Sequence, residues 1–159
     1  MKRVLKLVSA LFALIGCALM LGTQVVVKWG SNLKEAVGIK ALVGGEFTGQ
    51  YSKGIPFDGV SSGLAGYILL GAGAILVLLT ILVPIFKEHD ILSMVVTGLG
   101  VICFIIGIIL IFLIRKNFAA NVICDTVYVG WGAIAAGSLG SLAILFGGIG
   151  MLLDLTGTN

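Results

Sequence analysis

The chain has 159 residues, of which 59% are hydrophobic and 11% are charged, and its formal net charge is +3. A soluble domain averages roughly 25% charged residues, so lipid must be the solvent for much of this chain. The ten basic residues are scattered, with no stripe or motif that would favour nucleic acid as a partner.

Four apolar runs without a charged residue occupy about residues 7–27, 64–86, 91–114 and 127–153. Each is long enough to cross a hydrocarbon core of ~30 Å, and each must cross as a helix to satisfy its own backbone hydrogen bonds. The sequence therefore predicts the all-α membrane class. We expect one four-span domain over residues 1–159, a four-helix transmembrane bundle.

The N-terminus allows two interpretations. Lys2, Arg3 and Lys6 precede the first apolar run, as in a signal peptide, and Leu14–Cys17 looks like a bacterial lipobox that would make Cys17 an acylated N-terminus. The apolar run continues ten residues past Cys17, which favours an uncleaved first helix. The lipoprotein remains an alternative.

An even number of spans places both termini on one side of the membrane. The basic residues directly before the first helix favour the cytoplasm for that side, although the connections 28–63 and 115–126 contain more basic residues in total. We therefore expect cytoplasmic termini, the long loop 28–63 outside, and a four-residue inner turn at 87–90. His89, in that turn, is interpreted as part of a solvated stop between helices.

The long outer loop predicts a small folded unit. Side chains alternate on both sides of a Gly-Gly pair, which supplies the positive φ angles of a two-residue hairpin turn. The residues that define this hairpin are Val37, Ile39, Gly44, Gly45, Phe47 and Tyr51. A lone hairpin is marginal in water, and residues 122–128 are a candidate further strand, although they could also begin the fourth helix.

Four aromatic residues at or near the outer helix ends predict a belt at the water–lipid boundary. They are Trp29, Tyr67, Tyr128 and Trp131. Small residues spaced by four form two rows on the fourth helix, namely Gly132, Ala136 and Gly140 beside Ala133, Gly137 and Ser141. Such rows let helix backbones approach closely. We expect them to pack the bundle, with a docking face for a second copy or a partner as the alternative.

Charged residues are expected only at helix ends, which argues against a proton-coupled pump. The spacing of the three cysteines and the single histidine fits neither a metal site nor a redox motif, so no catalytic residue, metal or cofactor is predicted. Cys17 and Cys103 are interpreted as packing residues within helices. Cys124, in a connection, is the candidate for a reactive or paired thiol.

The layout resembles the claudin-type tetraspan proteins, with a long β-forming outer loop and a Gly/Ala-rich last helix. Trp29-Gly30 is only a fragment of the claudin signature, and no cysteine lies in 28–63. The chain is more similar to small uncharacterised prokaryotic membrane proteins, through the Gly-rich segment Gly59–Gly73 and the last helix from Val129. This resemblance implies a prokaryotic cell membrane and transfers no activity.

These features predict a non-enzymatic structural or interaction protein of the membrane. It would act as a homo-oligomer or as an accessory subunit of a larger complex, with lipid, its own copies or other subunits as partners. A passive channel or small-solute facilitator built from several copies is the second hypothesis, and a membrane enzyme is the least favoured.

Overall fold

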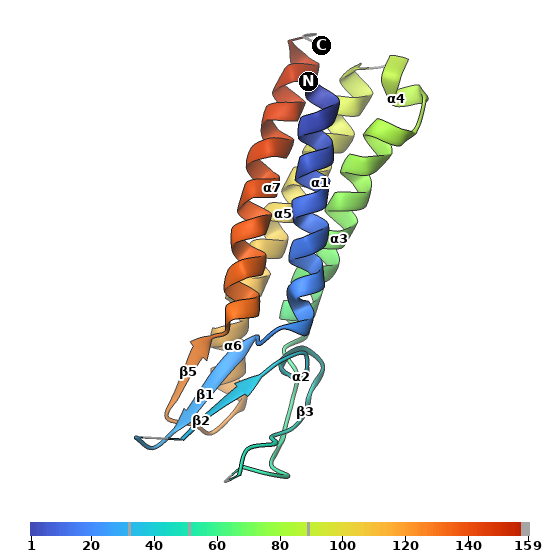
Figure 1. The fold of residues 1–159 in the computed structure, drawn as a ribbon. Coiled ribbons are helices and arrows are strands. Elements are labelled where there is room, and N and C mark those ends of the chain that lie inside the picture. The colour runs from blue at the N-terminus through green and yellow to red at the C-terminus, as the bar shows by residue number, and fades with distance from the viewer. Residues whose placement is uncertain (32, 51, 89, 157–159) are drawn as a thin grey trace.

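The computed structural model describes residues 1–31, 33–50, 52–88 and 90–156, so Tyr51 and His89 lie outside the described residues. Four long helices run side by side, a small sheet lies at one end of the bundle, and both termini lie at the other end (Figure 1). The bundle helices are α1 (Lys2–Ala18), α3 (Ser61–Leu82), α5 (Asp90–Phe112) and α7 (Trp131–Leu155). We call the two ends the sheet end and the terminal end.

Shorter elements complete the fold. The 3₁₀ turn η1 (Leu19–Leu21) extends α1, α4 (Ile85–Glu88) follows α3, and α6 (Ile114–Asn121) continues α5 after a break. The sheet end also contains α2 (Lys40–Val43) and five strands. These are β1 (Val25–Trp29), β2 (Leu33–Val37), β3 (Gly45–Glu46), β4 (Pro56–Phe57) and β5 (Thr126–Val129).

Within the described residues, four helical stretches are long and apolar enough to cross a membrane, as predicted: Lys2–Leu21, Ser61–Leu82, Asp90–Asn121 and Trp131–Leu155. Their outward faces carry large aliphatic side chains, and their inward faces are rich in glycine and alanine. Exposed examples from three different helices are Ile75, Ile102, Ile109 and Leu145. This distribution is the reverse of a water-soluble bundle and is the pattern of an integral membrane protein.

Two predicted helix boundaries are wrong at the sheet end. The first span ends at Leu21, because Gly22 is extended and the β-branched residues 25–27 form β1 instead of a last helical turn. The fourth span begins at Trp131, because residues 126–129 pair with β1. Of the two interpretations of residues 122–128, the strand is therefore correct for Thr126–Val129.

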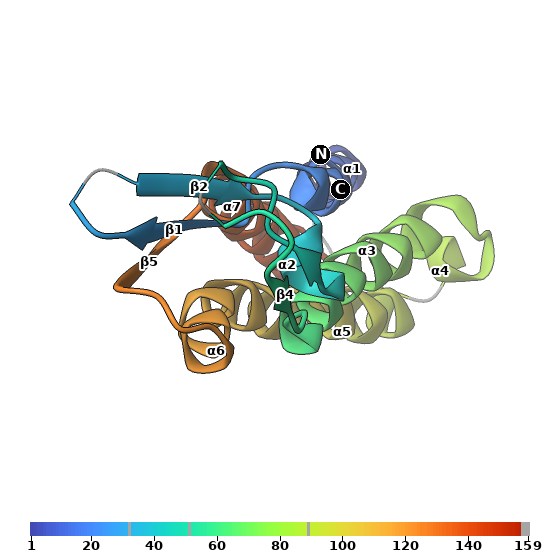
Figure 2. The ribbon, with the colours of Figure 1, turned by 90° about the horizontal axis from the view of Figure 1, so that it is seen from below.

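The main sheet joins two connections that are far apart in the sequence. Its strand order is β2-β1-β5, and both pairs are antiparallel. Val25 lies opposite Val37 on one side and Val129 on the other. Seen from the sheet end, β1 and β2 project past α7, while α2 and β4 lie near α3 and α5 (Figure 2).

The predicted hairpin around Gly44-Gly45 is wrong. Val37 ends β2 and pairs with β1, Ile39 precedes α2, and Gly44 ends that helix with φ +89°. The positive φ does occur at Gly44, but there it ends a helix and does not form a hairpin turn. Phe47 is buried and packs against the rings of Trp29 and Phe57. The segment after Gly45 is therefore not available to pair with residues 37–43.

Glycine lets α3 and α5 approach each other closely. A Cβ atom added at Gly66 would lie 2.7 Å from the carbonyl oxygen of Gly107, and one added at Gly73 would lie 2.8 Å from that of Gly100. Both contacts are with backbone, so no side chain can move aside. The two helices therefore depend on glycine at these crossings.

Candidate functional site

The small-residue rows of α7 lie largely inside the chain. Gly132, Ala133, Ala136, Gly137 and Gly140 are buried, whereas Ser141 is exposed. A Cβ atom at Gly132 would meet the carbonyl of Thr23, one at Gly137 the ring of Phe112, and one at Gly140 the side chain of Ile108. Within one chain, these rows are occupied by contacts with η1, the following turn and α5.

The interpretation of Tyr67 as a boundary aromatic is wrong, because Tyr67 is completely buried in the bundle. Its hydroxyl donates to Gln24 Oε1 at 2.7 Å. The Gln24 amide in turn donates to the carbonyls of Leu19, Met20 and Gly22. The last carbonyls of a helix have no hydrogen-bond donor within the helix. At the end of the first span, the Gln24 amide supplies these carbonyls with a donor, and Tyr67 holds Gln24 in place.

The other three aromatic residues of the predicted belt lie in the sheet or next to it. The Trp29 indole in β1 donates to the carbonyl of Ile123 at 3.2 Å and packs edge-on against Phe47. Tyr128 in β5 and Trp131 at the start of α7 are about half exposed. Only these last two have the exposure that a boundary aromatic needs.

A buried charge cluster, which residue patterns alone did not reveal, joins three helices at the terminal end. Lys6 of α1 forms an ion pair with Asp154 of α7, and the two side chains are 3% and 1% exposed. The Lys6 ammonium also donates to Ser93 Oγ of α5 at 2.8 Å, and the Ser93 hydroxyl donates to Asp154 Oδ2 at 3.2 Å. Lys6 was interpreted as a flanking charge, but the helix begins at Lys2, so Lys6 lies one turn inside.

A second ion pair flanks this cluster. Lys2 Nζ lies 2.7 Å from Asp90 Oδ1 and 3.6 Å from Asp154 Oδ1. Asp154 Oδ1 has no hydrogen-bond partner among the described residues and lines a cavity of about 20 Å³ together with Thr80 and Arg3. Lys6 is four residues along from Lys2, about 6 Å down the helix axis, so the cluster lies near the membrane boundary rather than at mid-depth.

Glu35 of β2 organises the turn that follows β3. Its carboxylate accepts hydrogen bonds from the Thr48 amide at 2.6 Å, from the Thr48 hydroxyl and from the Ser52 hydroxyl. Burial raises the pKa of Glu35, but these hydrogen bonds to the charged form outweigh it and hold the pKa below its usual value. A groove of about 310 Å³ lies beside this contact, between β2 and residues 46–48.

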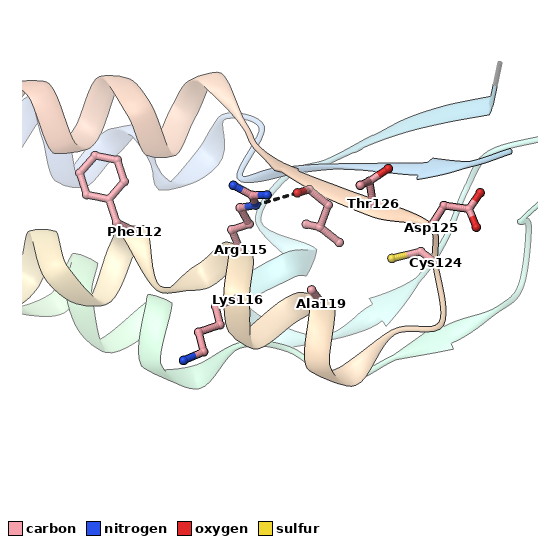
Figure 3. A pocket seen from close by; sticks show the side chains of 8 residues that line it. Phe112, Arg115, Lys116, Ala119, Cys124, Asp125 and Thr126 are labelled. Carbon is pink, nitrogen blue, oxygen red and sulfur yellow. Dashed lines mark hydrogen bonds between the residues drawn. The ribbon is translucent and has the colours of Figure 1, made fainter. Parts of the chain in front are cut away.

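A groove of about 470 Å³ lies between α6 and β5 (Figure 3). Arg115 and Lys116 line it on the helix side, and Cys124, Asp125 and Thr126 line it on the strand side. Arg115 Nε donates to the Val127 carbonyl at 2.9 Å, on the strand edge that faces away from β1.

Cys124 is a free thiol, as are Cys17 and Cys103. Burial raises the pKa of Cys124, and the negative charge of Asp125 adds to the effect. A thiol with a raised pKa is less ionised at neutral pH and therefore a weaker nucleophile. The groove consequently offers hydrogen-bonding and charged groups rather than an activated thiol.

Across the described residues, no group of three or more His, Cys, Asp or Glu side chains is placed to hold a metal ion. Comparison with known proteins adds no assignment: no family model matches the chain, and no curated protein matches it.

Proposed function

We propose that this integral membrane protein is a non-enzymatic interaction protein, a homo-oligomer or an accessory subunit of a larger membrane complex. Its sheet end would lie outside the cell and contact the partner. The observation that carries the proposal is an apolar patch at the sheet end, centred on Ile123, whose side chain is 99% exposed, and Ile55, which is 49% exposed. A groove of about 210 Å³ between them is walled by Trp29, Pro56 and Val122.

The patch is built on a rigid base. The ring centroids of Phe47 and Phe57 are 4.6 Å apart, and those of Phe57 and Phe118 are 5.3 Å apart. Trp29 ties this aromatic cluster to the Ile123 backbone. A preorganised surface loses little conformational entropy when it binds, and an exposed aliphatic patch favours association.

Partner contact through the sheet end is consistent with how the small residues of α7 pack. Because the rows on α7 are filled by contacts within the chain, they do not offer a free face for close helix approach. The outward helix faces carry large aliphatic side chains, which suit lipid. The sheet end therefore supports the interaction hypothesis better than the small-residue rows do.

A pore would have to form between copies. Among the described residues, the buried polar side chains include Asp154 at the terminal end, Ser9 and Thr97 about two turns in from that end, and Gln24 at the sheet end. Between them the buried side chains are apolar, including Leu70, Ala74 and Phe104. A single bundle thus lacks the lining of polar groups that a solute path uses.

The contacts of α1 support retention of the segment before Cys17. Lys6, Ser9, Ala10 and Ala13 all lie on its buried face, and the Ser9 hydroxyl donates to the Ala143 carbonyl at 2.6 Å. Cleavage before Cys17 would remove this face and leave Asp154 without its buried cation, which is costly. We expect the intact mass of the purified protein to include residues 1–16, and a shorter, acylated mass would contradict this.

Photocrosslinking tests the interaction hypothesis. Benzoylphenylalanine placed at Ile123 should give a discrete protein adduct in native membranes, and mass spectrometry would show whether the adduct is a second copy or another subunit. The same group at Ile102, which faces outward from the middle of α5, is the matched control and should label mainly lipid. The proposal fails if Ile123 gives no protein adduct and native mass spectrometry shows a lone monomer.

A further inference from the structure

The groove between α6 and β5 lies where the apolar run of α5 ends. Arg115 and Lys116 are the first charged residues after that run, which places their groups at the boundary between lipid and water. Phe112, one turn earlier, lines the same groove and is 46% exposed. The groove thus has an apolar wall on its membrane side and a cationic wall beyond it, and its volume is within the range of ligand sites.

Arg115 and Lys116 both line the groove, with Arg115 turned toward β5 and Lys116 extending to the other side of α6 (Figure 3). The Nε–H of Arg115 donates to the Val127 carbonyl, which holds the guanidinium at the edge of the groove and leaves its two Nη groups without a hydrogen-bond partner in the part of the chain that the structure describes (Figure 3). Among the described residues, neither Arg115 nor Lys116 forms an ion pair. The Asp125 carboxylate also lines the groove, but it accepts a hydrogen bond from the Gly30 amide and points away from Arg115 (Figure 3).

We propose that this groove binds a phosphate-type anion, supplied by a phospholipid headgroup or by a free phosphate ester. A guanidinium presents paired N–H donors that match two phosphate oxygens, and Lys116 adds a second positive charge. The Thr126 hydroxyl lies on the opposite wall as a neutral donor. For a lipid, Phe112, on the membrane side of the cations, would contact the first acyl carbons, and Ala119, beyond the cations, would lie beside the headgroup.

Native mass spectrometry of the full chain, released from maltoside micelles, measures this binding. The probes are dioleoyl phosphatidylglycerol for the lipid source and glycerol 3-phosphate for the soluble source. We expect one bound anion per chain. Arg115→Gln should weaken binding by about tenfold or more, since it removes a charge-assisted hydrogen bond, and Lys116→Gln should weaken it less, since it removes a nearby positive charge.

A steric variant separates a built site from general attraction to positive charge. Ala119→Leu fills the groove and leaves both cations in place, so it should reduce binding by about tenfold or more, comparable to the loss of a charge-assisted contact. Ala120→Leu makes the same change at the next residue, which is exposed and does not line the groove, and should bind as the unaltered chain does. Lys53→Gln, at an exposed loop position away from the groove, is the matched charge control.

Each outcome is decisive. Binding of the lipid alone identifies a headgroup site, and equal binding of glycerol 3-phosphate identifies a site for soluble phosphate esters. Binding that is lost equally in Ala119→Leu and Ala120→Leu, or that survives in both Arg115→Gln and Lys116→Gln, overturns the proposal, as does binding of neither probe. Crosslinking at Ile123 is independent of these variants, so the two proposals can fail separately.

Discussion

The buried charge cluster at the terminal end should dominate the stability of the bundle. Asp154→Asn keeps the shape of the side chain and removes its negative charge, which leaves Lys6 buried with Ser93 and an amide as its contacts. Breaking a buried ion pair on one side typically costs about 3–5 kcal/mol. For a chain of this size, we expect the midpoint of thermal unfolding to fall by roughly 6–20 °C.

The structure also predicts how the stabilities of the variants rank. In Lys6→Met, Asp154 keeps Lys2 at 3.6 Å, an attraction of about 4–5 kcal/mol at an effective dielectric of 20, which offsets part of the burial cost. Lys6→Met should therefore destabilise less than Asp154→Asn, and the double variant should be more stable than Asp154→Asn alone. Lys2→Met should cost about 1 kcal/mol or less through Asp90, because Asp90 is 46% exposed, and it should cost more through the lost attraction to buried Asp154.

Thermal unfolding of the full chain in one detergent, followed by circular dichroism, measures this series. A double-mutant cycle between Lys6 and Asp154 isolates their coupling from the separate effects of each substitution. If Asp154→Asn and Lys6→Met each changed stability by less than about 0.5 kcal/mol, as surface substitutions do, the two side chains would be hydrated and the buried pair would be refuted.

Three further outcomes follow from other contacts. Gly66→Ala should destabilise the bundle by about 1–3 kcal/mol through overpacking against the backbone of α5, whereas Gly148→Ala, which meets open space, should be neutral or slightly stabilising in the same unfolding assay. Tyr67→Phe should cost about 1–3 kcal/mol, because it leaves Gln24 Oε1 buried without its donor, and an unchanged midpoint would exclude that contact. The lowered pKa of Glu35 stabilises the sheet end fully above its usual value of 4.5, and this contribution is lost as the pH falls through the pKa of the folded chain. The protection factors of the amides in residues 46–50, which compare each exchange rate with the intrinsic rate at the same pH, should therefore fall in acid. In Glu35→Gln these protection factors should already be low at pH 7 and should change little in acid.

The spans were predictable because an unbroken run of twenty or more apolar residues in lipid can satisfy its backbone hydrogen bonds only as a helix. An extramembrane β-unit was predicted from alternation around Gly44-Gly45, but its main sheet is formed by other segments, apart from Val37 and the candidate strand at 122–128. Its pairing was not predictable, because alternation shows that a segment can be a strand without showing which strand it meets. The run Val25-Val26-Val27 was absorbed into the first span by its hydrophobicity, although its β-branched side chains favour a strand, and it became the centre of the sheet.

The buried charge cluster was hidden for a different reason: each of its charges, taken alone, looks like an ordinary helix-end residue. Topology nevertheless restricts the pairing, since four spans bring the first turns of α1 and the last turn of α7 to the same end. No Lys or Arg follows Lys116 in the sequence, so Asp154 needs a cation from another helix if it is buried. Lys6 meets that need, and Lys2 is neutralised by Asp90 in the same way. A lysine paired in this manner carries less net positive charge to the membrane surface than a count of basic residues assumes, so pairing across helix ends should be considered before such residues are used to orient a chain.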